Sequence, residues 1–190
     1  MPDGQGPYRV MPRPEIALGS LAALAVGPEH IEQIRRWRNA QMSVLRQSKC
    51  ISRDEQIAYF NSVIWPDKQS DRPSNILLMC LRDGDLIGYG GLVHISWSDL
   101  QAEISFLLDP VHRRDAQRYA AAFATWIDLM KSLAFEDLNL RKLTTETFAT
   151  RTDHLEILDQ SGFGRAGVLK GHVVIDGNRV DSILHGLEAE

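Results

Sequence analysis

The sequence predicts an α/β fold of the α+β kind, in which helices flank a mixed, mostly antiparallel central sheet. Short apolar runs are separated by turn residues, and Asp-Gly pairs at 83–84 and 176–177 lie between such runs, as in β-hairpins. Other stretches repeat apolar residues at helical spacing. A length of 190 residues fits one domain.

The N-terminal segment 1–14 is rich in Gly and Pro, so we expect it to be flexible and the domain to span 15–190. An apolar stretch, 16–25, predicts the first strand. A helix is expected to begin at Pro28, because proline suits a first helical turn.

A capping box predicts the second helix. Ser52 is a good N-cap residue, and Glu55 follows three positions later. Its apolar side is formed by Ile57, Phe60 and Ile64. We expect Pro66 to end the helix and 66–75 to form a polar, mobile surface loop.

The rest of the chain alternates strands and helices. Strands are expected at 75–81, 86–95 and 102–108, then a long helix at 116–135, a strand at 143–148, a helix from 152 to 160, and strands at 168–175 and 180–187. The three central strands would form an antiparallel meander.

Composition excludes several classes of function. Lys and Arg number 21 against 25 Asp and Glu, so the net charge of −4 offers no basic face for nucleic acid. Cys50 and Cys80 have neither disulfide nor metal-ligand spacing, and we predict no metal site. No apolar run reaches the roughly 18 residues of a membrane span. The run 16–26 resembles a short secretory signal, but Glu15 lies at its edge and it suits a strand, so we expect a cytoplasmic protein.

Five short blocks then occur in order. They are Trp37-Arg38-Asn39; Ile51-Ser52 with Glu55 and Phe60; Ile87-Gly88; Ala102-Glu103-Ile104; and Gly162-Phe163. Over about 16–187 the chain resembles the GNAT N-acetyltransferase superfamily, and within it the ribosomal-protein and amino-sugar-nucleotide branch that includes the pseudaminic-acid pathway enzyme. The resemblance implies acetyl transfer from acetyl-CoA, as co-substrate, to a primary amine.

The resemblance also implies where acetyl-CoA binds. The backbone of Phe106, Leu107 and Leu108 would pair with the pantetheine amides, and His154 falls where a small residue often faces the cofactor. The N-terminus of the long helix would hold the pyrophosphate. The segment 113–120 lacks the usual glycines, and Arg113, Arg114 and Arg118 are expected to supply charge instead. The alternative is that these arginines are only solvated.

For the catalytic base, Glu103 is the first candidate, because we expect apolar neighbours, which favour a neutral carboxyl. It could instead be a structural carboxylate paired with an arginine such as Arg38. His94 is the second candidate, Glu146 the third, and a chain of waters remains open. The tyrosine that many relatives use as general acid is replaced by Leu158, and Arg151 stands at an asparagine position.

The acceptor is expected between the first two helices, their loop and the last hairpin. Trp37, Arg38 and Tyr89 are candidates for binding it, although such aromatic residues are often core. Arg36, Arg38 and Arg46 could hold a diphosphate, so a small amine such as a nucleotide-linked amino sugar is favoured over a protein N-terminus. A module that binds acyl-CoA without turnover remains the alternative. The last hairpin, 168–187, could pair with a second copy to form a homodimer.

Overall fold

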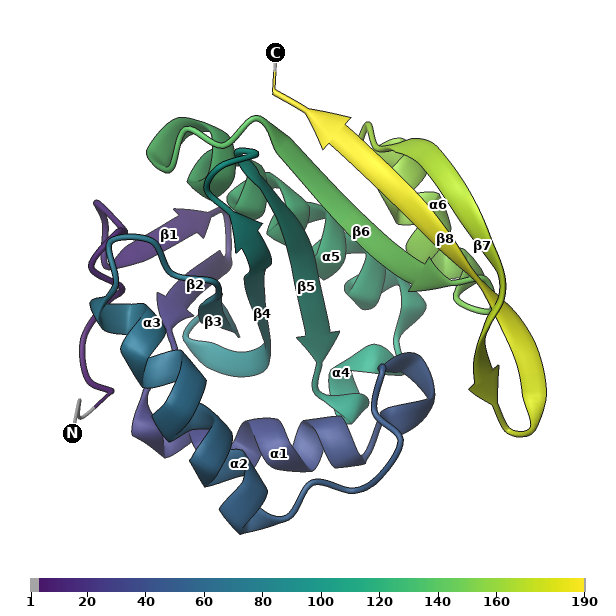
Figure 1. The fold of residues 1–190 in the computed structure, drawn as a ribbon, viewed down its shortest axis with the longest axis horizontal. Coiled ribbons are helices and arrows are strands. Elements are labelled where there is room, and N and C mark those ends of the chain that lie inside the picture. Colours follow the sequence, from purple (N-terminus) through teal and green to yellow (C-terminus); the bar gives the residue numbers. More distant parts are fainter. Residues whose placement is uncertain (1–3, 190) are drawn as a thin grey trace.

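One eight-stranded sheet organises the computed structural model, which describes residues 4–189 (Figure 1). Its strand order is β1-β2-β3-β4-β5-β6-β8-β7. The strands are β1 Glu15–Leu18, β2 Leu21–Ala25, β3 Ile76–Arg82, β4 Asp85–Ser96, β5 Gln101–Leu108, β6 Lys142–Phe148, β7 Gly164–Ile175 and β8 Asn178–Glu188. The helices are α1 Ile31–Asn39, α2 Arg53–Tyr59, α3 Trp65–Gln69, α4 Pro110–Arg113, α5 Ala116–Lys131 and α6 Thr152–Gln160. The predicted fold class is confirmed.

The pairing of β5 with β6 is the one parallel pairing in the described sheet, and it is short. It covers three residue pairs, from Gln101–Lys142 to Glu103–Thr144. Beyond Glu103, β5 pairs with β4 alone up to Leu108. The two strands therefore separate and open a gap in the sheet, as Figure 1 shows.

Apolar side chains of β5 alternate between two cores because successive strand residues point to opposite faces. Phe106 and Leu108 pack in the core that contains Phe123 of α5. Leu107 packs in the second core, with Trp37 of α1 and other residues of α1–α3. Helices thus cover both faces of the sheet near the gap.

The first predicted strand is wrong in one respect, because 16–25 forms a hairpin of β1 and β2 rather than one strand. Gly19 sits in the turn with a φ of 60°, a left-handed conformation that glycine adopts without steric cost. The apolar residues on both sides concealed this turn.

The prediction that the second helix ends at Pro66 is also wrong. A π-helical turn, Phe60–Ile64, follows α2, and the chain continues as α3 to Gln69. Pro66 lies in the first turn of α3, where its missing N–H is tolerated. Asp67 then accepts hydrogen bonds from the backbone N–H groups of Ser74 and Asn75, which fastens the loop to the helix.

The segment 4–14, which composition predicted to be flexible, packs onto the domain. Tyr8 is buried, and its hydroxyl accepts a hydrogen bond of 2.8 Å from the N–H of Leu77. The N–H of Arg9 donates to the carbonyl of Lys68. Residues 1–3 of the predicted segment, like Glu190, lie outside the described residues.

Within residues 4–189, no helix is long and apolar enough to cross a membrane. The same residues contain no group of three His, Cys, Asp or Glu side chains arranged to hold a metal ion.

Candidate active site

The gap between β5 and β6 contains a cavity of about 350 Å³. One wall is formed by β5 from Glu103 to Phe106 and the other by β6 from Thr145 to Phe148, and Arg151, just before α6, and His154 of α6 also line it. The cavity exists because the strands stop pairing after Glu103. It falls in the size range of small-molecule sites.

Three buried polar atoms lining this cavity have no hydrogen-bond partner among the described residues: Oγ1 of Thr145, Oε1 of Glu146 and Nε of Arg151. Leaving such groups unpaired costs about 1–3 kcal/mol each. A ligand that carries amide and carbonyl groups, such as a pantetheine arm, would satisfy those of Thr145 and Arg151. The cavity therefore fits the expected cofactor at these atoms.

The three cofactor-binding candidates of β5 differ in where their side chains lie. Phe106 lines the cavity and stacks on Phe123, with ring centroids 5.1 Å apart. The side chains of Leu107 and Leu108 point into the two cores. The carbonyl of Leu108 is already bonded to the side-chain amide of Gln41 at 2.8 Å. This part of the backbone edge is thus partly used by the protein itself.

Of the three candidate arginines between the end of α4 and the first turn of α5, two are paired with carboxylates. A guanidinium nitrogen of Arg113 lies 2.6 Å from the carboxylate of Asp153, and Arg118 pairs with Asp115 at 3.3 Å. Asp115 also caps α5 by accepting a hydrogen bond from the N–H of Arg118. A carboxylate thus occupies the position where the resemblance places the pyrophosphate. Among the described residues, Arg114 pairs with no carboxylate.

His154 lies in a buried network that the sequence did not reveal. Its Nδ1 is hydrogen-bonded to the hydroxyl of Tyr119 and lies 3.2 Å from a guanidinium nitrogen of Arg151, and its ring stacks on Phe123 at 3.9 Å. Burial, with the nearby Arg151 charge, holds the pKa of His154 well below its usual value. Burial also raises the pKa of Tyr119. No local pattern predicts Tyr119, because it is 35 residues from His154.

The catalytic candidates also line this cavity. Nδ1 of His94 lies 3.1 Å from one carboxylate oxygen of Glu103, and Arg46 lies 3.4 Å from the other. Arg46 also reaches Glu146 on β6 at 2.7 Å. The expectation of apolar neighbours for Glu103 is therefore wrong, and its arginine is Arg46 rather than Arg38. His94 has a φ of 51°, next to a β-bulge that turns the strand.

The sequence matches the family model described as an acetyltransferase (GNAT) domain over residues 25–184. The chain belongs to the GNAT acetyltransferase family. The predictions of this fold, of an N-acetyltransferase and of acetyl-CoA as acetyl donor are confirmed at the level of the family.

Solved structures of one enzyme share the fold of this GNAT protein. A spermidine N-acetyltransferase from Vibrio cholerae, in complex with CoA and spermine, is 20% identical with a TM-score of 0.78, and the match covers 89% of this chain and 95% of that chain. A dodecameric structure of spermidine N-acetyltransferase from the same organism is 18% identical with a TM-score of 0.75, covering 89% and 94%. No curated protein matches the sequence.

The substrate-binding candidates of this GNAT protein lie on α1 and β4. Trp37 is buried, donates its indole N–H to Asp109 at 2.9 Å and stacks on Tyr89, so it belongs to the core. Arg38 donates to the hydroxyl of Tyr89 at 3.2 Å and to Gln47 at 3.1 Å. Arg38 and Tyr89 both line a second cavity beneath α1 and α2.

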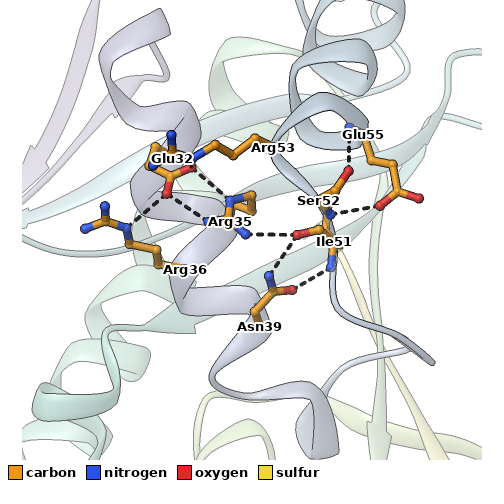
Figure 2. Close-up of polar contacts among 8 residues, drawn as sticks. All are labelled: Glu32, Arg35, Arg36, Asn39, Ile51, Ser52, Arg53 and Glu55. Atoms are coloured by element: carbon orange, nitrogen blue, oxygen red, sulfur yellow. Dashed lines mark hydrogen bonds and ion pairs between the residues drawn. The ribbon is translucent and has the colours of Figure 1, made fainter.

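A polar brace fixes the loop that carries Arg46 (Figure 2). The side chain of Asn39 binds both the N–H and the carbonyl of Ile51, at 2.8 and 2.9 Å. Figure 2 also shows the Glu32 carboxylate joined to the guanidinium groups of Arg35 and Arg36. Hydrogen bonding from Arg35, and then from Arg36, lowers the pKa of Glu32 to about 2.

The partners of three arginines correct the expectation of a diphosphate site. Arg36 is bonded to Glu32, Arg38 to Tyr89 and Gln47, and Arg46 to Glu103 and Glu146. The three guanidinium groups have separate partners and do not converge on one anion.

The predicted capping box is present, since Ser52 and Glu55 satisfy each other's backbone N–H groups.

Proposed function

We propose that this GNAT protein transfers an acetyl group from acetyl-CoA to the primary amine of a small molecule. The observation that carries this proposal is the pair formed by His94 and Glu103 at the point where β5 and β6 separate. A proton acceptor there lines the cavity, where a reacting amine has to lose its proton.

His94 is the proposed base and Glu103 its positioning partner. A carboxylate only accepts hydrogen bonds, so Nδ1 of His94 carries the proton that Glu103 binds. The lone pair then lies on Nε2, which can accept a proton from a substrate ammonium. Both oxygens of Glu103 are already engaged, by His94 and Arg46, which leaves it to orient the ring.

Acetyl-CoA, when bound, supplies an acetyl group activated as a thioester. The residues that would hold it are those that line the cavity with unpartnered polar atoms, Thr145 and Arg151. His154 would contact it from α6. Because the N–H of Arg151 and the hydroxyl of Tyr119 both approach Nδ1, the proton of His154 resides on Nε2, which has no hydrogen-bond partner among the described residues. That N–H is a donor at the cavity wall.

The acceptor is proposed to be a small amine rather than a nucleotide-linked amino sugar, because Arg36, Arg38 and Arg46 are bonded to separate partners. The carboxylates of Glu146 and Glu103 would attract the ammonium group of the acceptor. In this structure both carboxylates pair with the guanidinium group of Arg46. The branch of amino-sugar-nucleotide enzymes therefore has no support in this site.

The test is release of free thiol from acetyl-CoA with a panel of amines between pH 6 and 9. His94→Gln should lower kcat by about 10²–10⁴-fold, the range for loss of a general base. Glu103→Gln should lower kcat less and alter the pH profile. His30→Gln is the matched control, since this ring lies outside both cavities, where it accepts the N–H of Gly27 and lies 3.4 Å from Glu29.

Two outcomes would contradict the proposal. An unchanged kcat for His94→Gln would remove His94 as the base. Calorimetric binding of acetyl-CoA without thiol release for any amine would favour the module that binds acyl-CoA without turnover.

The outer edge of β7 supports the proposal of a homodimer. Within residues 4–189, β7 pairs with β8 alone, and Val168 and Val174 are exposed on it. An exposed strand edge is a template for pairing with another chain. Sedimentation equilibrium of the chain and of a Val174→Lys variant would measure this association.

A further inference from the structure

A second cavity, of about 340 Å³, lies beneath α1 and α2 and is largely apolar. Its walls include Ile34 of α1, Phe60 after α2, Leu77 of β3 and Val93 of β4. Most of these side chains belong to the core on this face of the sheet. A space of this size lined by apolar side chains suits the body of a small organic molecule.

This apolar cavity is continuous with the cavity between β5 and β6. Arg38, Tyr59, Val93 and Ser105 line both. Val93 directly precedes His94, and Ser105 is two residues from Glu103. A molecule whose amine is at His94 can therefore extend its body into the apolar cavity.

Three polar side chains lining this cavity make no hydrogen bond to the described residues: the amide of Gln56 and the hydroxyls of Tyr59 and Ser105. Gln56 is 3% exposed and lines the cavity. By contrast, three side-chain amides of α1 and the loop after it are bonded: Asn39 to Ile51, Gln41 to Leu108, and Gln47 to Asn39. The Gln56 amide is not among the fully buried unpaired atoms, so it is accessible from the cavity and can hydrogen-bond to a polar group on a ligand.

Charge in the cavity selects against a second cation. Arg38 is a fixed positive charge in the wall, bonded to Tyr89 and Gln47. The carboxylate at its edge, Glu55, is bound to Lys49 and to the N–H of Ser52. A second ammonium inside would be buried without a free counter-ion, which is unfavourable.

We propose that the apolar cavity binds the body of the acceptor, and that the acceptor is a monoamine with an aryl or alkyl body and one group that hydrogen-bonds to Gln56. This inference rests on the proposed function and names its substrate class. It excludes polyamines and amino sugars as preferred acceptors.

Calorimetry with the amine alone tests the cavity without acetyl transfer. The probes are tyramine, 2-phenylethylamine, spermidine and glucosamine. Tyramine should bind best. Gln56→Leu should weaken the affinity for tyramine by about 3–10-fold, as expected for loss of one hydrogen bond, while leaving the affinity for 2-phenylethylamine nearly unchanged. The apolar leucine is expected to fit the apolar walls and keep the fold.

A second variant fills the space. Ile51→Phe, on the loop at the cavity edge, should raise KM for tyramine at least 10-fold, with a much smaller effect for ethylamine, which needs no cavity. Thermal unfolding checks that both variants fold.

Outcomes separate the two proposals. Binding that depends on Gln56 without acetylation of any amine supports the cavity and overturns the proposed function. Acetylation with spermidine or glucosamine preferred, or tyramine binding unaffected by both substitutions, overturns the cavity and leaves the proposed function standing.

Discussion

The hydroxyl of Tyr119 on α5 is hydrogen-bonded to Nδ1 of His154 on α6, and Arg151 donates to the same hydroxyl at 3.0 Å. Since a guanidinium only donates, the hydroxyl accepts from Arg151 and donates to His154. The imidazole is thereby held neutral with its proton on Nε2. This network ties α5 to α6, whose His154 lines the cavity between β5 and β6.

Stability should depend on pH through His154. The folded state depresses the pKa of this buried ring below its usual value of 6.5, so below about pH 6.5 the unfolded chain binds a proton that the folded chain does not. The contribution of the neutral His154 to the free energy of unfolding should therefore be complete above that pH. It should fall as the solution is acidified, with a slope approaching about 1.4 kcal/mol per pH unit.

Urea unfolding between pH 5 and 7.5 measures this slope, and His154→Gln should reduce it. Equal slopes for the two proteins would contradict a buried neutral His154.

The carboxylate that caps α5 should weaken phosphate binding. Asp115→Asn keeps a good N-cap residue but removes the charge. Affinity for CoA should rise by about 3–10-fold at low salt, and the gain should shrink at high salt because exposed charges are screened. Calorimetry measures the affinity, with Asp176→Asn in the β7–β8 turn as control. An unchanged affinity would place the phosphates elsewhere.

The brace at Asn39 should stabilise the loop that carries Arg46. Asn39→Ala leaves the N–H and carbonyl of Ile51 without this partner, so the free energy of unfolding should fall by about 1–3 kcal/mol. Denaturant unfolding measures the loss. KM for the acceptor should also rise, because Arg46 and Ile51 lie beside the two cavities; a loss of stability with unchanged KM would mean that the brace serves the fold alone.

Gly91 should be intolerant of any side chain. Its φ is 137°, and a Cβ atom there would lie 1.9 Å from the carbonyl oxygen of Ile76 on the neighbouring strand. Gly91→Ala should cost about 3 kcal/mol or more. Gly186→Ala is the control, because the nearest atom to its Cβ would be 3.5 Å away. Similar melting temperatures for the two variants would contradict the close approach of β3 and β4.

Much of the fold could be predicted because its signals are local. The capping box of Ser52 and Glu55 spans three residues, and the turn at Asp83-Gly84 joins two adjacent strands. The pairing of His94 with Glu103 is local in the same sense, since both lie on one antiparallel pair of strands joined by a short turn. Errors arose where apolar residues hid a turn, at Gly19, and where a helix accommodated Pro66.

The sequence by itself determined the fold class, the GNAT family and the strand pair that carries His94 and Glu103, because hydrophobic period, turn residues and short motifs act over a few neighbouring residues. The tertiary structure alone decided which charges meet and which groups stay unpaired. Arg46 contacts Glu146 from a distant loop, Tyr119 binds His154 across two helices, and Arg151 keeps a buried Nε without a partner among the described residues. These relations depend on how elements pack, and no spacing along the chain encodes them.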